Sequence, residues 1–369
     1  MTTAYSGDGI TFPDNSVQAT APRVGMVNRI INGDMRIDQR NAGASVTPTN
    51  GQYSLDRWKY YSSQTSKVSI QQNASSVTPP AGFKNYLGVT SLSAYSVTAS
   101  DYFTITQLVE GFNMADFGYG AAGASTVTLS FWVRSSLTGT FGGSLTNDAA
   151  NYAYPFTYSI SVANTWEQKS ITITGATAGT WQSTNAAGIQ VLFALGAGST
   201  YSGTAGAWVA AGFLPSATGA TSVVGTSGAT FYLTGVQLEK GSTATDFEYV
   251  DYGRQLQMCQ RYYSTSFPAG TAPAQNSGLY TWKVSHLKSG YGGYYTFKTP
   301  VSMRTAPTIT GYNGGAANNL VRNIPNAADL TSLGITVPTN SSFTIVTYGG
   351  AGDNLLEPVG WNWSASAEL

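Results

Sequence analysis

The sequence contains few of the residues on which metal binding and much enzyme chemistry depend. It has one cysteine, Cys259, and one histidine, His286, in 369 residues. A disulfide framework needs paired cysteines, and zinc sites need several cysteine or histidine ligands. The sequence therefore predicts no disulfide, no metal and no cofactor, and it leaves material for at most one histidine-dependent catalytic triad.

Charge and long apolar runs are also scarce. Charged residues make up 10% of the chain, and 18 Lys and Arg balance 18 Asp and Glu. Proteins that bind phosphates or anionic lipids carry an excess of Lys and Arg, which this chain lacks, so we expect no nucleic-acid partner. No run reaches the roughly 18 apolar residues of a membrane span, so we expect no membrane insertion. Residues 1–9 lack the basic and apolar segments of a secretory signal.

The residues that are abundant favour β-structure. The chain has 42 glycines, 23 tyrosines and 8 tryptophans, a composition typical of twisted strands joined by tight turns. Residues 126–135 alternate between apolar and polar, which places Val127, Leu129, Phe131 and Val133 on one face. Similar alternation recurs in residues 156–162, 171–173 and 189–195. Several such strands in series predict an all-β protein built on a β-sandwich.

The pattern along the chain divides it into four parts. Residues 1–25 are predicted to form an attachment arm, residues 26–250 a jelly-roll sandwich, residues 251–263 a connecting helix, and residues 264–369 a smaller C-terminal β-sandwich. Asp251 is placed to cap the helix. In the strand near residue 230 the alternation changes phase at Gly235, which predicts a β-bulge. No fixed-period repeat is present, which disfavours solenoids and propellers.

Segments in the same order along the chain resemble those of the tail fibre and receptor-binding proteins of tailed bacteriophages. They are residues 28–41 (NRIINGDMRIDQRN) with 54–58 (SLDRW), residues 231–241 (FYLTGVQLEKG) with 247–263, residues 300–307 (PVSMRTAP) with the terminal 364–369 (SASAEL), and residues 9–20 near the start.

This resemblance implies a homotrimer in the phage virion that adsorbs to a surface glycan outside the bacterial host cell. It implies a middle jelly roll like those of carbohydrate-binding modules, and an arm that joins other tail proteins through Ile10, Phe12 and Pro13. Release by cell lysis would bring such a protein outside without a signal. Related jelly rolls often hold calcium, but Arg36 and Gly235 replace the expected oxygen ligands here, so that site is not carried over.

Candidate glycan-binding residues are aromatics in loops rich in small polar residues. Sugar recognition combines an aromatic ring against the sugar face with amide and hydroxyl groups at its hydroxyls. Residues of this kind are Trp181, Tyr201 and Trp208 in the middle domain and Tyr291, Tyr294 and Tyr295 in the C-terminal domain. The small polar loops 313–319 and 349–354 are further candidates. Loop aromatics also serve to pin loops to the protein body.

Other aromatic and apolar residues are predicted to pack. Trp58 and Trp166 are expected in the core, and Trp132 lies on the polar face of its strand as a candidate subunit contact. Leu256 and Cys259 lie three residues apart on the predicted helix and are candidates for a three-fold contact. Cys259 is also read as a small packing residue.

Two alternative functions stay open at this stage. A polysaccharide depolymerase would need two carboxylates about 5 to 10 Å apart, and Asp246 with Glu248 or Glu239 with Asp251 are candidate pairs. His286 is in phase with a packed strand face, which disfavours a role as general base. We therefore predict that the protein is not an enzyme. A purely structural connector of the particle would show the same arm and trimer, but it would bury its tyrosines and tryptophans between chains.

Overall fold

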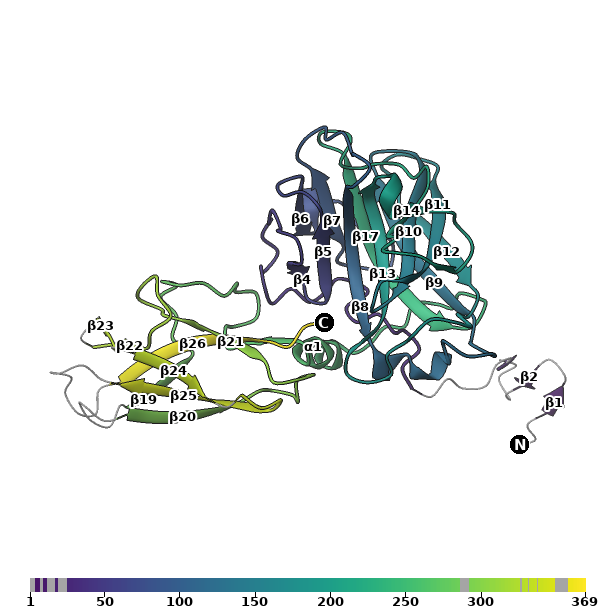
Figure 1. Cartoon of the computed structure of the whole chain (residues 1–369). Coiled ribbons are helices and arrows are strands. Elements are labelled where there is room, and N and C mark those ends of the chain that lie inside the picture. Colours follow the sequence, from purple (N-terminus) through teal and green to yellow (C-terminus); the bar gives the residue numbers. More distant parts are fainter. Residues whose placement is uncertain are drawn as a thin grey trace.

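The computed structural model describes the backbone of residues 4–6, 9–11, 17–18, 25–285, 292–325, 327–330, 332–336, 338–348 and 358–369. Within these ranges it leaves undescribed the side chains of 4–18, 284–285, 292–293, 332–333 and 348. The described chain is almost entirely β-structure, with a single α-helix (Figure 1). The predicted all-β class is correct.

The middle domain is a sandwich of two antiparallel sheets. The first contains, in spatial order, β15 (Val209–Ala210), β11 (Tyr152–Ile160), β10 (Gly139–Asn147), β13 (Ala187–Ala197), β8 (Tyr102–Glu110), β5 (Trp58–Ser62) and β4 (Tyr53–Leu55). The second contains β12 (Glu167–Ile173), β9 (Val127–Ser135), β17 (Thr230–Lys240), β7 (Leu87–Ser91) and β6 (Val68–Gln72). The sequence neighbours β8 and β9 lie in different sheets, as in a jelly roll.

One apolar core fills the space between the two sheets. The inward faces of the strands supply it, as the period-2 alternation of β9 predicts. Trp58, Phe131 and Phe193 are at most 1% exposed. The prediction that Trp58 lies in the core is therefore confirmed. Trp166, by contrast, is half-buried beside Tyr86 and Tyr232, outside the main core.

The predicted bulge at Gly235 is confirmed, and it has a structural partner. The pairing of β17 with β9 shifts register between Thr234 and Gln237, and Gly235 has a φ of 59°. The turn at Asn32 and Gly33 lies against this bulge: Val236 N donates to Gly33 O at 2.9 Å, and Asn28 Nδ2 donates to Val236 O at 3.0 Å. The first motif segment is thus held by the last long strand of the sandwich.

Helix α1 (Tyr252–Gln260) leads from the sandwich to the C-terminal domain. Asp251 caps it by accepting a hydrogen bond from Arg254 N, as predicted. The helix ends before the expected residue 263, because β18 (Tyr263–Thr265) begins there and pairs with the final strand, β26 (Pro358–Ser366).

The C-terminal domain has its own small core around β26. This strand pairs with β18, β19 (Trp282–Ser285), β21 (Thr308–Tyr312) and β22 (Arg322–Asn323), which continues to β23 (Ala328–Asp329). A separate sheet contains β20 (Gly292–Lys298), β25 (Ser342–Tyr348) and β24 (Ser332–Thr336). Trp361, Phe343 and Ile345 are at most 1% exposed and belong to a core separate from that of the middle domain.

Short elements complete the described chain. They are β1 (Ala4–Ser6), β2 (Gly9–Thr11), β3 (Val17–Gln18), β14 (Ser202–Gly203) and β16 (Ser216–Ala217), with the 3-10 turns η1 (Ala74–Ser76), η2 (Gly111–Asn113), η3 (Ala115–Phe117) and η4 (Ser199–Tyr201). Among the described residues, no helix has both the length and the apolar character that crossing a membrane requires.

Candidate functional site

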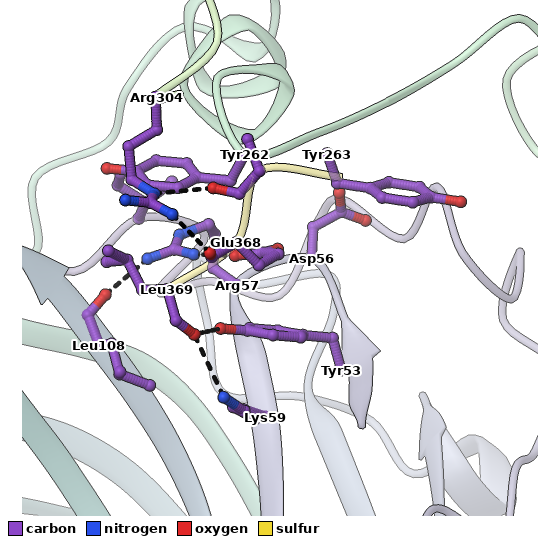
Figure 2. Close-up of polar contacts among 12 residues, drawn as sticks. Tyr53, Asp56, Arg57, Lys59, Leu108, Tyr262, Tyr263, Arg304, Glu368 and Leu369 are labelled. Carbon is purple, nitrogen blue, oxygen red and sulfur yellow. Dashed lines mark hydrogen bonds and ion pairs between the residues drawn. The ribbon is translucent and has the colours of Figure 1, made fainter. Parts of the chain in front are cut away.

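Residues of the segments 28–41, 54–58, 247–263, 300–307 and 364–369 meet at the junction of the two domains, and Figure 2 shows several of them. Arg57, which is 1% exposed, pairs with Glu368 from the terminal segment and donates to Leu108 O on β8 at 2.5 Å. Its guanidinium also lies over the Tyr262 ring, 3.6 Å from the centroid. Arg40 binds the other oxygen of Glu368 at 2.7 Å. One carboxylate thus joins two arginines of the sandwich to the end of the chain.

Further contacts fix the terminal segment. The Arg304 guanidinium donates to Ala367 O and Glu368 O, both at 2.8 Å, and to Asn185 O on the sandwich at 2.9 Å. The Tyr53 hydroxyl donates to Leu369 O at 2.6 Å. Figure 2 shows the contacts of Arg304 with the terminal segment and that of Tyr53 with Leu369. Through Arg304, the motif at residues 300–307 therefore binds both the terminal motif and the sandwich.

A second buried carboxylate, Glu110 at the end of β8, binds the residues that follow helix α1. Arg261 donates to both of its oxygens, at 2.9 and 2.5 Å, and the Tyr262 hydroxyl donates at 2.6 Å. Glu110 is 1% exposed. We call Arg40, Arg57, Glu110, Arg261, Tyr262, Arg304 and Glu368 the junction cluster. Each charged group of the cluster has a partner within the chain, which is an opposite charge for Arg40, Arg57 and Arg261 and backbone carbonyls for Arg304, so the cluster links the two domains.

Asp56 lies next to this cluster with an unusual protonation equilibrium. It is fully buried, and burial raises the pKa of its carboxyl to about 7, although Arg40 and hydrogen bonds from Gln39 favour the charged form. Gln39 donates to it through its backbone N at 2.6 Å and its Nε2 at 2.7 Å. A perturbed pKa can mark a catalytic group, but this carboxyl is sealed inside the protein.

The outer face of the seven-stranded sheet is closed by the chain's own loop. Residues 198–225 cross it: β16 packs on β10, β11 and β13, and Thr221 N donates to Thr140 O at 2.7 Å. Outward-facing side chains beneath are fully buried, among them Thr104, Thr106 and Leu192. The loop therefore covers this sheet face over β10, β11 and β13.

The predicted aromatics of the middle domain pin loops. Trp181 and Trp208 are half-buried and meet edge to face at 5.4 Å, and their ring N–H groups donate to Ala178 O and Thr174 O. Tyr201 packs edge to face on Tyr102 at 4.9 Å. The structure gives all three a packing role, and ligand contact by them stays a prediction.

Among the described side chains of the C-terminal domain, the large exposed aromatic is Tyr294 on β20. Its side chain is 71% exposed, while the neighbouring Tyr295 points to the opposite face and packs on Trp282 at 4.9 Å. The structure gives Tyr295 a packing role on the opposite strand face, because consecutive strand residues face opposite sides, and ligand contact by it stays a prediction. Tyr291 lies outside the described residues.

Threonines line the sheet face that carries Tyr294. Thr296 on β20 pairs with Thr344 on β25, and Thr344 pairs with Thr336 on β24. The hydroxyls of Thr296 and Thr344 are 2.9 Å apart. We call Tyr294, Thr296, Thr344 and Thr336 the Tyr294 surface. Sequence reasoning found only its tyrosine, although the threonines share its period-2 phase, which is visible in the sequence.

The predicted subunit contacts differ in their accessibility. Cys259 is fully buried among Ile31, Ile37 and Tyr262 of its own chain, and burial raises the pKa of its thiol well above the ordinary value. Cys259 is therefore a packing residue, and the alternative prediction that it contacts another subunit fails. Leu256 and Trp132 are half-buried, and their contact with a second copy stays a prediction.

Several predicted residues cannot be placed. Phe12, Pro13, His286 and the loop 349–354 lie outside the described residues, as does the side chain of Ile10. The loop 313–319 is described and folds inward: Asn313 is fully buried and donates to Asp329 at 2.8 Å.

Three of the four carboxylates considered for catalysis have structural partners, and Asp246 is exposed. Glu248 accepts from Asn28 N at 2.7 Å, Asp251 caps helix α1, and Glu239 is fully buried and accepts from the Thr245 hydroxyl at 2.7 Å. Where a related fold would place a calcium ligand, Arg36 pairs with Asp34. Within the described part of the chain, no group of three or more His, Cys, Asp or Glu residues is arranged to hold a metal.

No protein-family model and no curated protein sequence matches this chain. Solved structures with a similar fold include the enzymatically active domain of tailspike protein 4 from bacteriophage CBA120, with a TM-score of 0.32 and 13% identity over 58% of this chain and 22% of that one. A putative sugar binding protein from Bacteroides thetaiotaomicron has a TM-score of 0.33 and 10% identity, covering 58% and 100% of the two chains. A family 11 carbohydrate-binding module from Clostridium thermocellum has a TM-score of 0.28 and 11% identity, covering 55% and 98%. The chain thus spans about a fifth of the tailspike, and its neighbours are carbohydrate-binding modules and a phage tailspike domain.

Proposed function

We propose that this protein is a non-enzymatic fibre of a tailed-phage virion that adsorbs to a bacterial surface glycan through the Tyr294 surface. The observation that carries the proposal is the Tyr294 side chain, which is 71% exposed in a domain whose other described aromatics pack inward or at its edges. Burying this ring against a ligand would gain hydrophobic stabilisation.

The neighbouring side chains suit a neutral sugar. A pyranose ring stacks its C–H face on an aromatic ring and presents hydroxyls at its rim. The hydroxyl of Thr296 lies on the same face as Tyr294, with those of Thr344 and Thr336 alongside. Hydroxyl groups both donate and accept hydrogen bonds, as sugar hydroxyls do.

The position of this surface fits adsorption. In Figure 1, β20, β24 and β25 lie at the end of the molecule opposite to β1 and β2. An arm at residues 1–25 that attaches to other tail proteins would therefore leave the Tyr294 surface pointing away from the particle. Assembly as a homotrimer would present three copies, and many fibres on one particle would multiply a weak affinity.

Glycan binding can be tested on the full-length protein with an array of purified bacterial capsule and O-antigen polysaccharides. We expect binding to one or a few polysaccharides. Tyr294→Ala should weaken that binding about tenfold, because the ring contributes on the order of 1.4 kcal/mol by stacking. Tyr294→Phe, which keeps the ring, should bind nearly as the parent does.

The matched control is Phe112→Ala, which removes an aromatic side chain that is 61% exposed on the middle domain. It should leave glycan binding unchanged. Reducing sugar released during the assay would contradict the proposal in favour of a depolymerase. Absence of binding to the whole array, or equal binding by Tyr294→Ala, would favour a structural component of the particle.

A further inference from the structure

A cleft of about 310 Å³ opens where the sandwich, helix α1 and the C-terminal domain meet. The turn at residues 36–42 and Gln72 form one wall, Tyr252, Leu256 and Gln260 of the helix form the second, and the loop at residues 265–271 forms the third. Its volume is at the lower end of the roughly 300–1,000 Å³ range of small-molecule sites. We call it the junction cleft. It shares no residue with the Tyr294 surface.

The charged residues of the cleft are already neutralised. Arg36 pairs with Asp34 and donates to Val250 O at 2.7 Å. Asp38 accepts hydrogen bonds from three backbone N–H groups, those of Arg40, Asn41 and Gly43. A phosphate or carboxylate ligand would find no cation in the cleft without a partner of its own, so the site disfavours anions.

The amide side chains of the cleft keep hydrogen-bonding capacity. The Gln260 side chain has no hydrogen-bond partner among the described residues, and Gln72 uses only its Nε2, which donates to Met35 O at 2.6 Å. A purely apolar ligand would cover these amide groups without satisfying their hydrogen bonds, which is unfavourable. The ligand must therefore bring both donors and acceptors.

Apolar and aromatic side chains lie beside these amides. Tyr252, which is 51% exposed, and the half-buried Leu256 share the helix wall with Gln260, and Phe267 belongs to the third wall. Amides with unused hydrogen-bonding capacity and an exposed aromatic ring in one cleft, with no unpaired charge, are the features that recognise an uncharged polyhydroxylated ring. We propose that the junction cleft binds one neutral sugar ring, with Gln260 and Gln72 at its hydroxyls and Tyr252 against its C–H face.

The junction cleft is separate from the Tyr294 surface, and a ligand bound there would have a further effect on the protein. A sugar in the cleft touches both domains and the helix between them. Binding would therefore stabilise the arrangement of the domains as well as attach the protein to a glycan.

The test is saturation-transfer NMR on the full-length protein with four probes: D-glucose, D-galactose, D-mannose and L-rhamnose. We expect at least one to receive saturation and to titrate in the millimolar range. Gln260→Leu, which removes the amide and keeps a good helix former, should weaken binding about tenfold, equivalent to about 1.4 kcal/mol. Tyr252→Ala should weaken it to a similar extent.

Gln257→Leu is the matched control, because Gln257 lies on the exposed side of the same helix, outside the cleft. It should bind as the parent does, and thermal unfolding should show that all three variants fold. Absence of saturation transfer to all four sugars, displacement of the sugar by inorganic phosphate, or equal loss in Gln257→Leu would overturn the proposal. Loss of sugar binding in Tyr294→Ala with Gln260→Leu unaffected would assign the signal to the Tyr294 surface instead.

Discussion

Several of the protein's few charged side chains are concentrated at the junction of the middle and C-terminal domains. In a chain with only 10% charged residues, Arg57, Glu110 and Glu368 are all nearly or fully buried at the junction. Burying a charge is costly unless a partner and hydrogen bonds compensate it. Arg57 and Glu368 lie in two of the segments that resemble tail fibres, and there these residues join the domains.

The Arg57–Glu368 pair gives the sharpest prediction at this scale. Glu368→Leu should destabilise the protein by about 3–5 kcal/mol, because it leaves the guanidinium of Arg57 buried and unpaired. Thermal or urea unfolding measures this loss. The double variant Arg57→Met/Glu368→Leu should recover part of it, because both charges are then absent.

The control for that prediction is an exposed pair. Arg29 and Asp116 approach to 3.0 Å, but the Asp116 side chain is 48% exposed. Asp116→Ala should change the free energy of unfolding by no more than about 1 kcal/mol. A loss in Glu368→Leu as small as this would show that the junction pair does not hold the domains.

Asp101 predicts an acid-sensitive contribution to stability. It is 2% exposed; burial opposes its ionisation, but hydrogen bonds from Thr98, Ser63 and Tyr95 outweigh that effect and hold the pKa of its carboxyl below the ordinary value. A lowered pKa in the folded state stabilises the protein above pH 3.8, and this stability is lost as the pH falls further.

The test compares Asp101→Asn with the parent at two pH values. At pH 7 the variant should be less stable by about 2 kcal/mol, because an amide cannot accept all of these hydrogen bonds. The difference in free energy of unfolding between the parent and Asp101→Asn should be smaller at pH 2, because part of the stability that the ionised Asp101 gives the parent is lost there. Asp246→Asn, at an exposed carboxyl, should show neither effect. A constant difference at both pH values would contradict the assigned pKa.

At the scale of elements, local patterns predicted strands well and contacts between elements poorly. The alternation in residues 126–135 identifies β9, and the phase change at Gly235 identifies its bulge, because both depend on neighbours in sequence. The loop that covers the seven-stranded sheet and the packing of Cys259 depend on residues distant in sequence. No periodicity reports such contacts. Tyr294 and Tyr295 are an intermediate case. The alternation places them on opposite faces of the strand, but it does not show which face is buried.

Contact between the Asn32–Gly33 turn and the β17 bulge predicts an intolerance to side chains. A Cβ atom on Gly33 would lie 2.2 Å from Val236 O, a backbone atom that cannot move without disturbing the bulge. Gly33→Ala should therefore lower the stability by at least about 3 kcal/mol or abolish soluble expression. Gly212→Ala is the control, because a Cβ there meets nothing within 4 Å. Equal melting temperatures for Gly33→Ala and Gly212→Ala would contradict the predicted close contact between Gly33 and Val236.

The whole molecule combines two separate cores with a polar joint. The sandwich core and the core around β26 share no residues, and the contacts of the junction cluster tie them through side chains and the terminal segment. Such a joint fixes the direction in which the C-terminal domain projects. For an adsorption fibre, this direction determines whether the Tyr294 surface faces the host.

Multivalency is the last prediction, and it belongs to the assembled molecule. A single shallow surface built on one ring and a few hydroxyls supports only weak binding, so adsorption by this route requires several copies to act together. Sedimentation of the purified protein should give about three times the 38.8 kDa chain mass. Binding to a dense layer of the recognised polysaccharide should be at least about 100-fold tighter than binding to its soluble oligosaccharide. A monomeric mass with equal affinity for layer and oligosaccharide would contradict adsorption by avidity, because one Tyr294 surface would then have to supply all of the binding free energy.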